Sequence, residues 1–139
     1  MSCAGWTSDD QNVLFTYWRA VNVQVVLACI TTGADVNARN EYGQTLLHLT
    51  AASTDKPAVI TALIEAGADV NARTEDGETP LHAAAASTDS PAVITALIKA
   101  GANGAAANDH GKTPFDLAKE NDAIKGSDAY WALNDARFK

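Results

Sequence analysis

The hydrophobic and polar positions of residues 69–102 predict an extended segment followed by two helices. Residues 69–78 are polar, lack helical periodicity and contain an Asp-Gly pair, which is typical of a tight turn. A first helix is predicted from Thr-Pro at 79–80 to about residue 86, because threonine caps a helix and proline suits its first position. A second helix is predicted from a cap and first-turn proline, Ser-Pro at 90–91, to the glycine at 101. Its apolar side chains lie along one face: Val93, Ile94, Leu97 and Ile98.

This unit of 34 residues is repeated along the chain. Residues 35–68 match residues 69–102 at 26 of 34 positions, counted directly along the sequence. A weaker copy opens at residue 103, and residues 11–34 align in the same register. A unit this short cannot bury an apolar face alone, so it must stack on its neighbours. We therefore predict a single all-α solenoid domain of about four units over residues 1–139: degenerate caps at 1–34 and 103–139, and central repeats at 35–68 and 69–102.

The end units differ from the central ones in ways that suit caps. Tyr130, Trp131 and Leu133 supply large side chains that the alanine-rich repeats lack, and we expect them to form a lid over the last repeat. The loop between the two helices of each central unit is polar and contains a proline. This loop is expected to leave the stacking intact.

The start of each first helix carries a family signature. Residues 79–84 read Thr-Pro-Leu-His-Ala-Ala, and the unit closes with Gly-Ala at 101–102. This unit resembles the ankyrin repeat, a β-turn finger followed by two helices with the motif T-P-L-H-x-A. The upstream copy has Leu46 in place of the proline, and the downstream copy has Asp116 in place of the histidine. The resemblance spans about residues 33–121. One departure is that each central unit is one residue longer than the consensus, in the interhelical loop.

The resemblance implies a protein that binds another protein through a concave face made by the fingers and the first, inner helices. The alternatives are that charged fingers only confer solubility, or that the chain is a structural scaffold without a specific partner. A metal-binding protein or an enzyme is a further, weaker alternative. Tyr42 is the candidate anchor, because aromatic residues are enriched among interaction hot spots. The variable finger positions that would contact the partner are Arg39, Glu41, Tyr42, Gln44, Arg73, Glu75, Asp76, Glu78, Asp109, His110 and Lys112.

Residues with catalytic or metal-binding potential do not form a recognisable motif. His48 and His82 occupy equivalent repeat positions after a threonine, and the resemblance gives them a structural role in a hydrogen-bond network. His110 is expected on a finger surface. The sequence contains no nucleotide-binding loop, nucleophile elbow, zinc spacing or calcium loop. We therefore predict no enzymatic activity, no metal and no cofactor.

Charge narrows the class of partner. The chain has a net charge of −7, which argues against binding to nucleic acid or to an anionic membrane surface. No apolar run has the roughly 18 residues of a membrane-spanning helix, so membrane insertion is not expected. A monomer that binds a protein partner is the resulting expectation.

The two cysteines are Cys3 and Cys29. The repeat register places Cys29 on a core column, and spacing alone leaves open a disulfide with Cys3 or two reduced thiols. The opening Cys-x-Gly-Trp and the closing Gly-x-Asp-Ala-Tyr-Trp are similar to segments of a group of exported bacterial ankyrin proteins. That resemblance implies a Cys3–Cys29 disulfide and an exported protein whose signal peptide has been removed, because disulfides persist in oxidising compartments. A cytoplasmic location is the alternative.

Overall fold

A computed structural model describes residues 36–37, 39, 42–53 and 56–138 of the chain. All regular secondary structure within these ranges is helical. The predicted N-terminal unit, with Cys3 and Cys29, lies outside them. The helices are α3 (Leu46–Ser53), α4 (Pro57–Glu65), α5 (Pro80–Ser87), α6 (Pro91–Lys99), α7 (Pro114–Ala118) and α8 (Asp128–Ala136).

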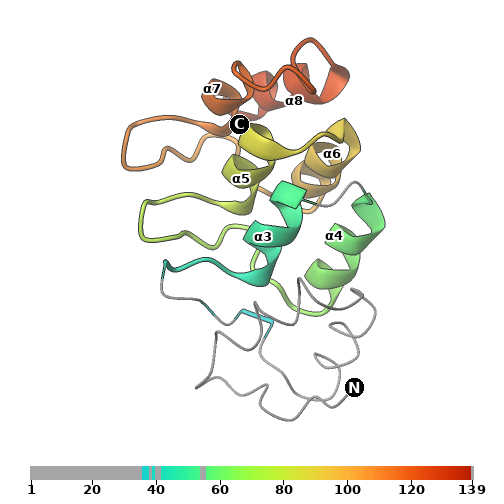
Figure 1. Ribbon diagram of the computed structural model, residues 1–139, viewed down its shortest axis with the longest axis vertical. Coiled ribbons are helices and arrows are strands. Elements are labelled where there is room, and N and C mark those ends of the chain that lie inside the picture. Colours follow the sequence, from blue (N-terminus) through green and yellow to red (C-terminus); the bar gives the residue numbers. More distant parts are fainter. Residues whose placement is uncertain (1–35, 38, 40–41, 54–55, 139) are drawn as a thin grey trace.

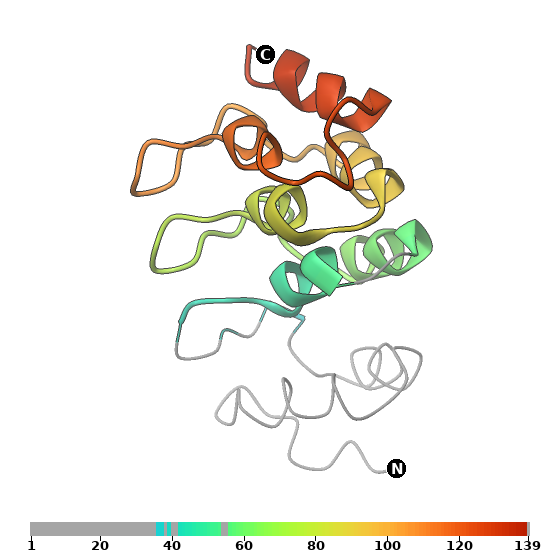
Figure 2. The same cartoon turned by 45° about the horizontal axis from the view of Figure 1, so that its top comes forward.

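The helices stack in two rows, as the solenoid prediction required. Helices α3, α5 and α7 form an inner row beside the described parts of three fingers, and α4, α6 and α8 form an outer row (Figure 1). Each helix packs on its sequence neighbour and on the equivalent helix of the adjacent unit. Seen from the second direction, the fingers again project to one side of the stack (Figure 2). The described part of the chain is therefore an all-α solenoid, which confirms the predicted fold class.

The helix boundaries follow local capping chemistry. Thr79 caps α5, because its side chain accepts a hydrogen bond from the backbone N–H of His82 and Pro80 occupies the first helical position. Gly101 ends α6 with a φ of +100°, and the next amide, from Ala102, reaches the carbonyl of Leu97 at 3.0 Å. This pairing is a Schellman motif, in which glycine adopts the left-handed conformation without the penalty of a Cβ atom.

One predicted cap is wrong in its detail. Ser90 stands at the N-cap position of α6, but its side chain makes no capping hydrogen bond. Within the loop, the Oγ1 of Thr88 accepts a hydrogen bond from the Ser90 amide at 3.1 Å. The Nδ2 of Asn121, from the following unit, donates to the carbonyls of Ala85 at 3.0 Å and Thr88 at 2.9 Å. The longer interhelical loop is therefore held by the next unit, and the stack continues past it.

The core runs through the stack between the two rows. Leu46, Leu63, Leu81 and Leu97 are almost completely buried, and alanines fill the spaces between them. Small side chains let the helices approach closely. The unit therefore buries its apolar face against neighbours rather than around a thick centre of its own.

The predicted lid over the last repeat is only partly correct. Tyr130 and Leu133 are buried, and the Tyr130 ring lies 4.8 Å from the Phe115 ring between centroids. Trp131, however, is 55% exposed, and its ring meets the Tyr130 ring edge-on with 4.9 Å between centroids. Successive residues of α8 point about 100° apart, so Trp131 cannot share the buried face with Tyr130.

Candidate functional site

The described parts of the three fingers lie along one side of the solenoid (Figures 1 and 2). Adjacent finger tips are joined by backbone hydrogen bonds, from Glu75 N to Tyr42 O at 3.2 Å and from Asp109 N to Asp76 O at 3.0 Å. The tip of the second finger turns at Gly77, whose φ is +77°. A Cβ atom there would lie 2.8 Å from a carboxylate oxygen of Asp109, so glycine also permits the close approach of the next finger.

Two arginines from the predicted partner surface hold neighbouring fingers together. An Nη atom of Arg39 donates to the carbonyl of Arg73, and an Nη atom of Arg73 donates to the carbonyl of Ala107 at 3.2 Å. Glu78 has a similar contact, because its Oε1 accepts a hydrogen bond from Asn108 Nδ2 at 3.2 Å. These side chains therefore have a structural role between units in addition to any contact with a partner.

The structure brings the predicted interface residues to this finger edge. Tyr42 is 62% exposed at the tip of the first finger. Gln44 and Glu78 are half-buried near the finger bases, and Glu41 lies outside the described residues. The exposed members of the predicted set are Arg39, Tyr42, Arg73, Glu75, Asp76, Asp109, His110 and Lys112.

His48 joins α3 to the second finger, and His82 joins α5 to the third finger. The Nδ1 of His82 accepts from the Thr79 backbone N–H at 3.1 Å, and its Nε2 lies 2.9 Å from the carbonyl of Lys112. His48 repeats this arrangement with Thr45 and with the carbonyl of Glu78, at 3.1 Å and 2.9 Å. An Nδ1 that accepts and an Nε2 that faces a carbonyl define a neutral imidazole with its proton on Nε2. The network predicted from the resemblance is thus present, and both rings are fully engaged in it.

The same positions in the last unit lack the outward half of this network. Asp116 replaces the histidine, and its Oδ2 accepts from the Thr113 backbone N–H at 3.0 Å. A carboxylate has no proton to donate onward, so the bond to a further finger is lost. Two other links to the next unit are also missing one repeat later. Asn71 Oδ1 accepts from the Asn103 amide at 2.8 Å and Arg73 donates to the Ala107 carbonyl, but the equivalent positions are Ala105 and Ala107. The inter-unit hydrogen bonds of the described fingers therefore stop at the third finger.

Burial sets the charge state of the two buried histidines. Desolvation lowers the pKa of both His48 and His82 below the ordinary value of 6.5, although their hydrogen bonds to backbone carbonyls act in the opposite direction. Arg39 lowers the pKa of His48 and Glu78 raises it. The pKa of His82 is raised by Glu78 and lowered by Arg73.

Mild acid is expected to weaken the stack through these two histidines. Their folded-state pKa values lie below the unfolded value, so the unfolded chain binds more protons and is favoured as the pH falls. The contribution of the two histidines to the free energy of unfolding should be complete above about pH 6.5. It should decline as the pH falls toward their lowered folded-state pKa values. The pKa of Asp116 is lowered from 3.8, mainly by its hydrogen bond to the Thr113 backbone, so its contribution is lost only at more acidic pH. Urea unfolding across this range checks the expectation. A flat profile between neutral pH and pH 5, or one altered equally by His110→Gln on the surface, would contradict it.

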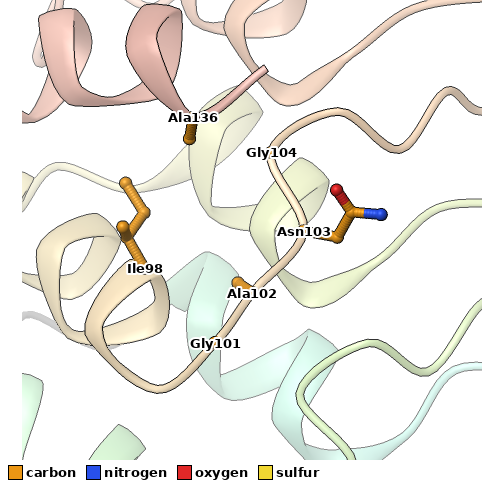
Figure 3. A pocket seen from close by; sticks show the side chains of 6 residues that line it. All are labelled: Ile98, Gly101, Ala102, Asn103, Gly104 and Ala136. Atoms are coloured by element: carbon orange, nitrogen blue, oxygen red, sulfur yellow. The ribbon is translucent and has the colours of Figure 1, made fainter. Parts of the chain in front are cut away.

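A shallow hollow of about 350 Å³ lies between the end of α6 and the end of α8 (Figure 3). Its lining is Ile98, Gly101, Ala102, Asn103, Gly104 and Ala136, with no charged side chain. A Cβ atom on Gly104 would lie 2.5 Å from the Ala136 Cβ, so glycine allows α8 to approach the chain here. This hollow offers a packing contact rather than a set of reactive groups.

The described residues lack two other classes of site. No three histidine, cysteine, aspartate or glutamate side chains among them converge into a metal-binding group. Within the same ranges, no helix combines the length and hydrophobicity needed to cross a bilayer.

Comparison with known proteins agrees with this geometry. A family model described as ankyrin repeats (3 copies) matches residues 18–109 and 51–129, which together cover most of the chain. No curated protein matches the chain with significant similarity. The matched residues include the fingers, helices α3 to α7 and both Thr-x-x-His networks, and on these grounds the chain belongs to the ankyrin-repeat family.

Proposed function

We propose that this protein is a non-catalytic module that binds a protein partner through the finger edge and the adjoining ends of the inner helices. Ankyrin repeats generally mediate protein–protein interaction and are typically non-enzymatic. The observation that carries the proposal is the exposure of Tyr42 on an edge of polar finger tips held in fixed relation by backbone hydrogen bonds. A rigid edge binds with less loss of conformational entropy than flexible loops do.

The chemistry of this edge favours a partner that has both an apolar pocket and cationic groups. Tyr42 offers one aromatic side chain, and the neighbouring tips offer the exposed carboxylates of Glu75, Asp76 and Asp109. A pocket would receive the tyrosine ring, and rim charges would act mainly on the association rate and on its salt dependence. Arg39 and Arg73 stabilise this edge, because each donates a hydrogen bond to a backbone carbonyl of the neighbouring finger.

Tyr42→Ala is expected to reduce partner affinity by about 1–3 kcal/mol, the usual cost of truncating an aromatic hot spot. The melting temperature should barely change, because the side chain lies mostly in solvent at a finger tip. The partner would first be captured from the native host on the immobilised protein, and then titrated against wild type and variant.

Thr61→Ala on the exposed face of α4 is the matched control. It changes a side chain of the outer row and should leave affinity unchanged. Normal binding by Tyr42→Ala and by Asp76→Lys, with a loss in Thr61→Ala, would place the partner on the opposite face. Normal binding by all three, or no captured partner, would favour the scaffold alternative.

We propose in addition that the chain acts as a monomer that neither binds nucleic acid nor inserts into a membrane. Residues 1–34 and 103–139 are proposed as its capping units. The hydrogen bonds between units end at the third finger, which supports the assignment of residues 103–139 as the C-terminal cap. Export, with a disulfide between Cys3 and Cys29, rests on the resemblance to exported bacterial ankyrin proteins.

A further inference from the structure

The outward face of α8 alternates acidic and aromatic side chains. The exposed residues of this helix and the turn after it are Asp128, Trp131, Asp135 and Phe138. Their spacing of three, four and three residues places them on one side of the helix. Trp131 is 55% exposed and Phe138 is 76% exposed, which makes them two of the three large hydrophobic side chains exposed in the described chain. We call these four residues the α8 stripe.

The position of the α8 stripe explains why it is uncovered. In the outer row, α6 packs on both α4 and α8, whereas the main contacts of α8 are with α6 and α7. No described element covers its remaining side, which lies at the end of the stack (Figures 1 and 2). The rest of the helix is anchored by Tyr130 and Leu133, so the stripe is presented on a packed element.

Charge selects among the possible occupants of this face. The stripe contains two carboxylates and no cation. The nearby Arg137 is held between the Phe115 and Phe138 rings, with its Cζ at 4.8 Å and 4.7 Å from their centroids. Pairing with a second copy would set carboxylate against carboxylate, which is unfavourable. A segment rich in lysine or arginine would instead pair with Asp128 and Asp135, and its cations would stack on the Trp131 ring.

From this alternation we infer that the α8 stripe is a second docking surface, separate from the finger edge, for a basic amphipathic segment of a protein partner. Apolar side chains of that segment lie against Trp131 and Phe138. Its ammonium or guanidinium groups pair with the two aspartates. The net charge of −7 assists the encounter at low salt.

The test uses the full chain and a fluorescently labelled synthetic peptide in which lysine and leucine alternate at helical spacing. A peptide with glutamate in place of lysine serves as the matched probe. Fluorescence anisotropy is recorded for wild type, Trp131→Ala, Trp131→Phe and the pair Asp128→Lys with Asp135→Lys. The finger pair Glu75→Lys with Asp76→Lys makes the same change in net charge at the other surface. Circular dichroism melting confirms that each variant is folded.

The lysine peptide should bind wild type, and the glutamate peptide should not. Trp131→Ala and the α8 reversal should each weaken binding about tenfold or more, and Trp131→Phe should retain most of it, since one aromatic replaces another. The finger reversal should change binding less than about twofold, because its charges lie beyond the screening distance at moderate salt.

Four results would overturn the inference. The first is a loss of peptide binding in the finger reversal but not in the α8 reversal, and the second is an equal loss in both. The third is preferential binding of the α8 stripe to zwitterionic lipid vesicles. The fourth is self-association of the protein that Trp131→Ala abolishes. Loss of native-partner binding in Tyr42→Ala tests only the finger edge, so the two proposals can fail separately.

Discussion

His82→Ala is expected to lower the free energy of unfolding by about 2–4 kcal/mol, more than a single exposed hydrogen bond contributes. The ring is fully buried and satisfies the Thr79 amide at 3.1 Å and faces the Lys112 carbonyl at 2.9 Å. Truncation leaves both groups without their partner and opens a cavity between α5 and the third finger. Because neighbouring units stabilise one another in a solenoid, the loss extends to both sides of the defect.

Asp116→Ala is the matched comparison for this prediction. Asp116 makes the local capping bonds to Thr113 but none to a further finger, so its removal should cost about 1 kcal/mol, as for other lost caps. Urea denaturation of the two variants at neutral pH measures the difference. Equal losses would mean that the bond from the imidazole to the next finger adds no stability. Stoichiometric zinc bound through His48 and His82 would contradict the structural role altogether.

The second large effect is expected from the cysteine pair. The proposed Cys3–Cys29 disulfide would close a loop of about 25 residues and should stabilise the fold by about 3 kcal/mol in the chain-entropy model. Reduction of protein isolated from an oxidising compartment should therefore lower its melting temperature measurably. The repeat register, which places Cys29 on a core column, motivates the proposed pairing together with the resemblance to a group of exported bacterial ankyrin proteins.

Intact mass before and after reduction, followed by alkylation, identifies the disulfide directly. Cys3→Ser should lower stability to that of the reduced wild type, and reductant should then have no additional effect. Two free thiols in protein isolated from an oxidising compartment would reject the disulfide and remove much of the support for export.

Most of the described fold could be predicted from the sequence because its determinants are local. The Thr-Pro start of α5, the glycine end of α6 and the Asp-Gly turn of the second finger each act within a few residues. The 34-residue period then requires stacking, since no unit can bury its apolar face alone. Ser90 shows the limit of such signals, because a good capping residue at the correct position forms no capping bond.

The positions that form the finger edge could be predicted from the sequence. The contacts that each side chain makes there could not. From the sequence, Arg39 and Arg73 were expected to contact a partner at the surface. The structure shows that each donates a hydrogen bond to a backbone carbonyl of the next finger. The repeat spacing offered one usable signal: the arginine column ends at Ala107, where no further finger accepts a bond. The role of Asn121 had no such signal, because its two carbonyl partners lie 36 and 33 residues earlier in the chain.

By itself, the sequence determined the repeat and the order of finger and helices, because periodicity and capping are encoded within each unit. The histidine network was implied by the resemblance to the ankyrin repeat. Only the tertiary structure decided which aromatic side chains remain exposed. Tyr130 and Trp131 are adjacent and similar in size, yet one is buried against Phe115 and the other faces solvent. The rotation of α8 on its neighbours and the lack of a described element beyond it set that difference. These are properties of the packed stack rather than of any local segment.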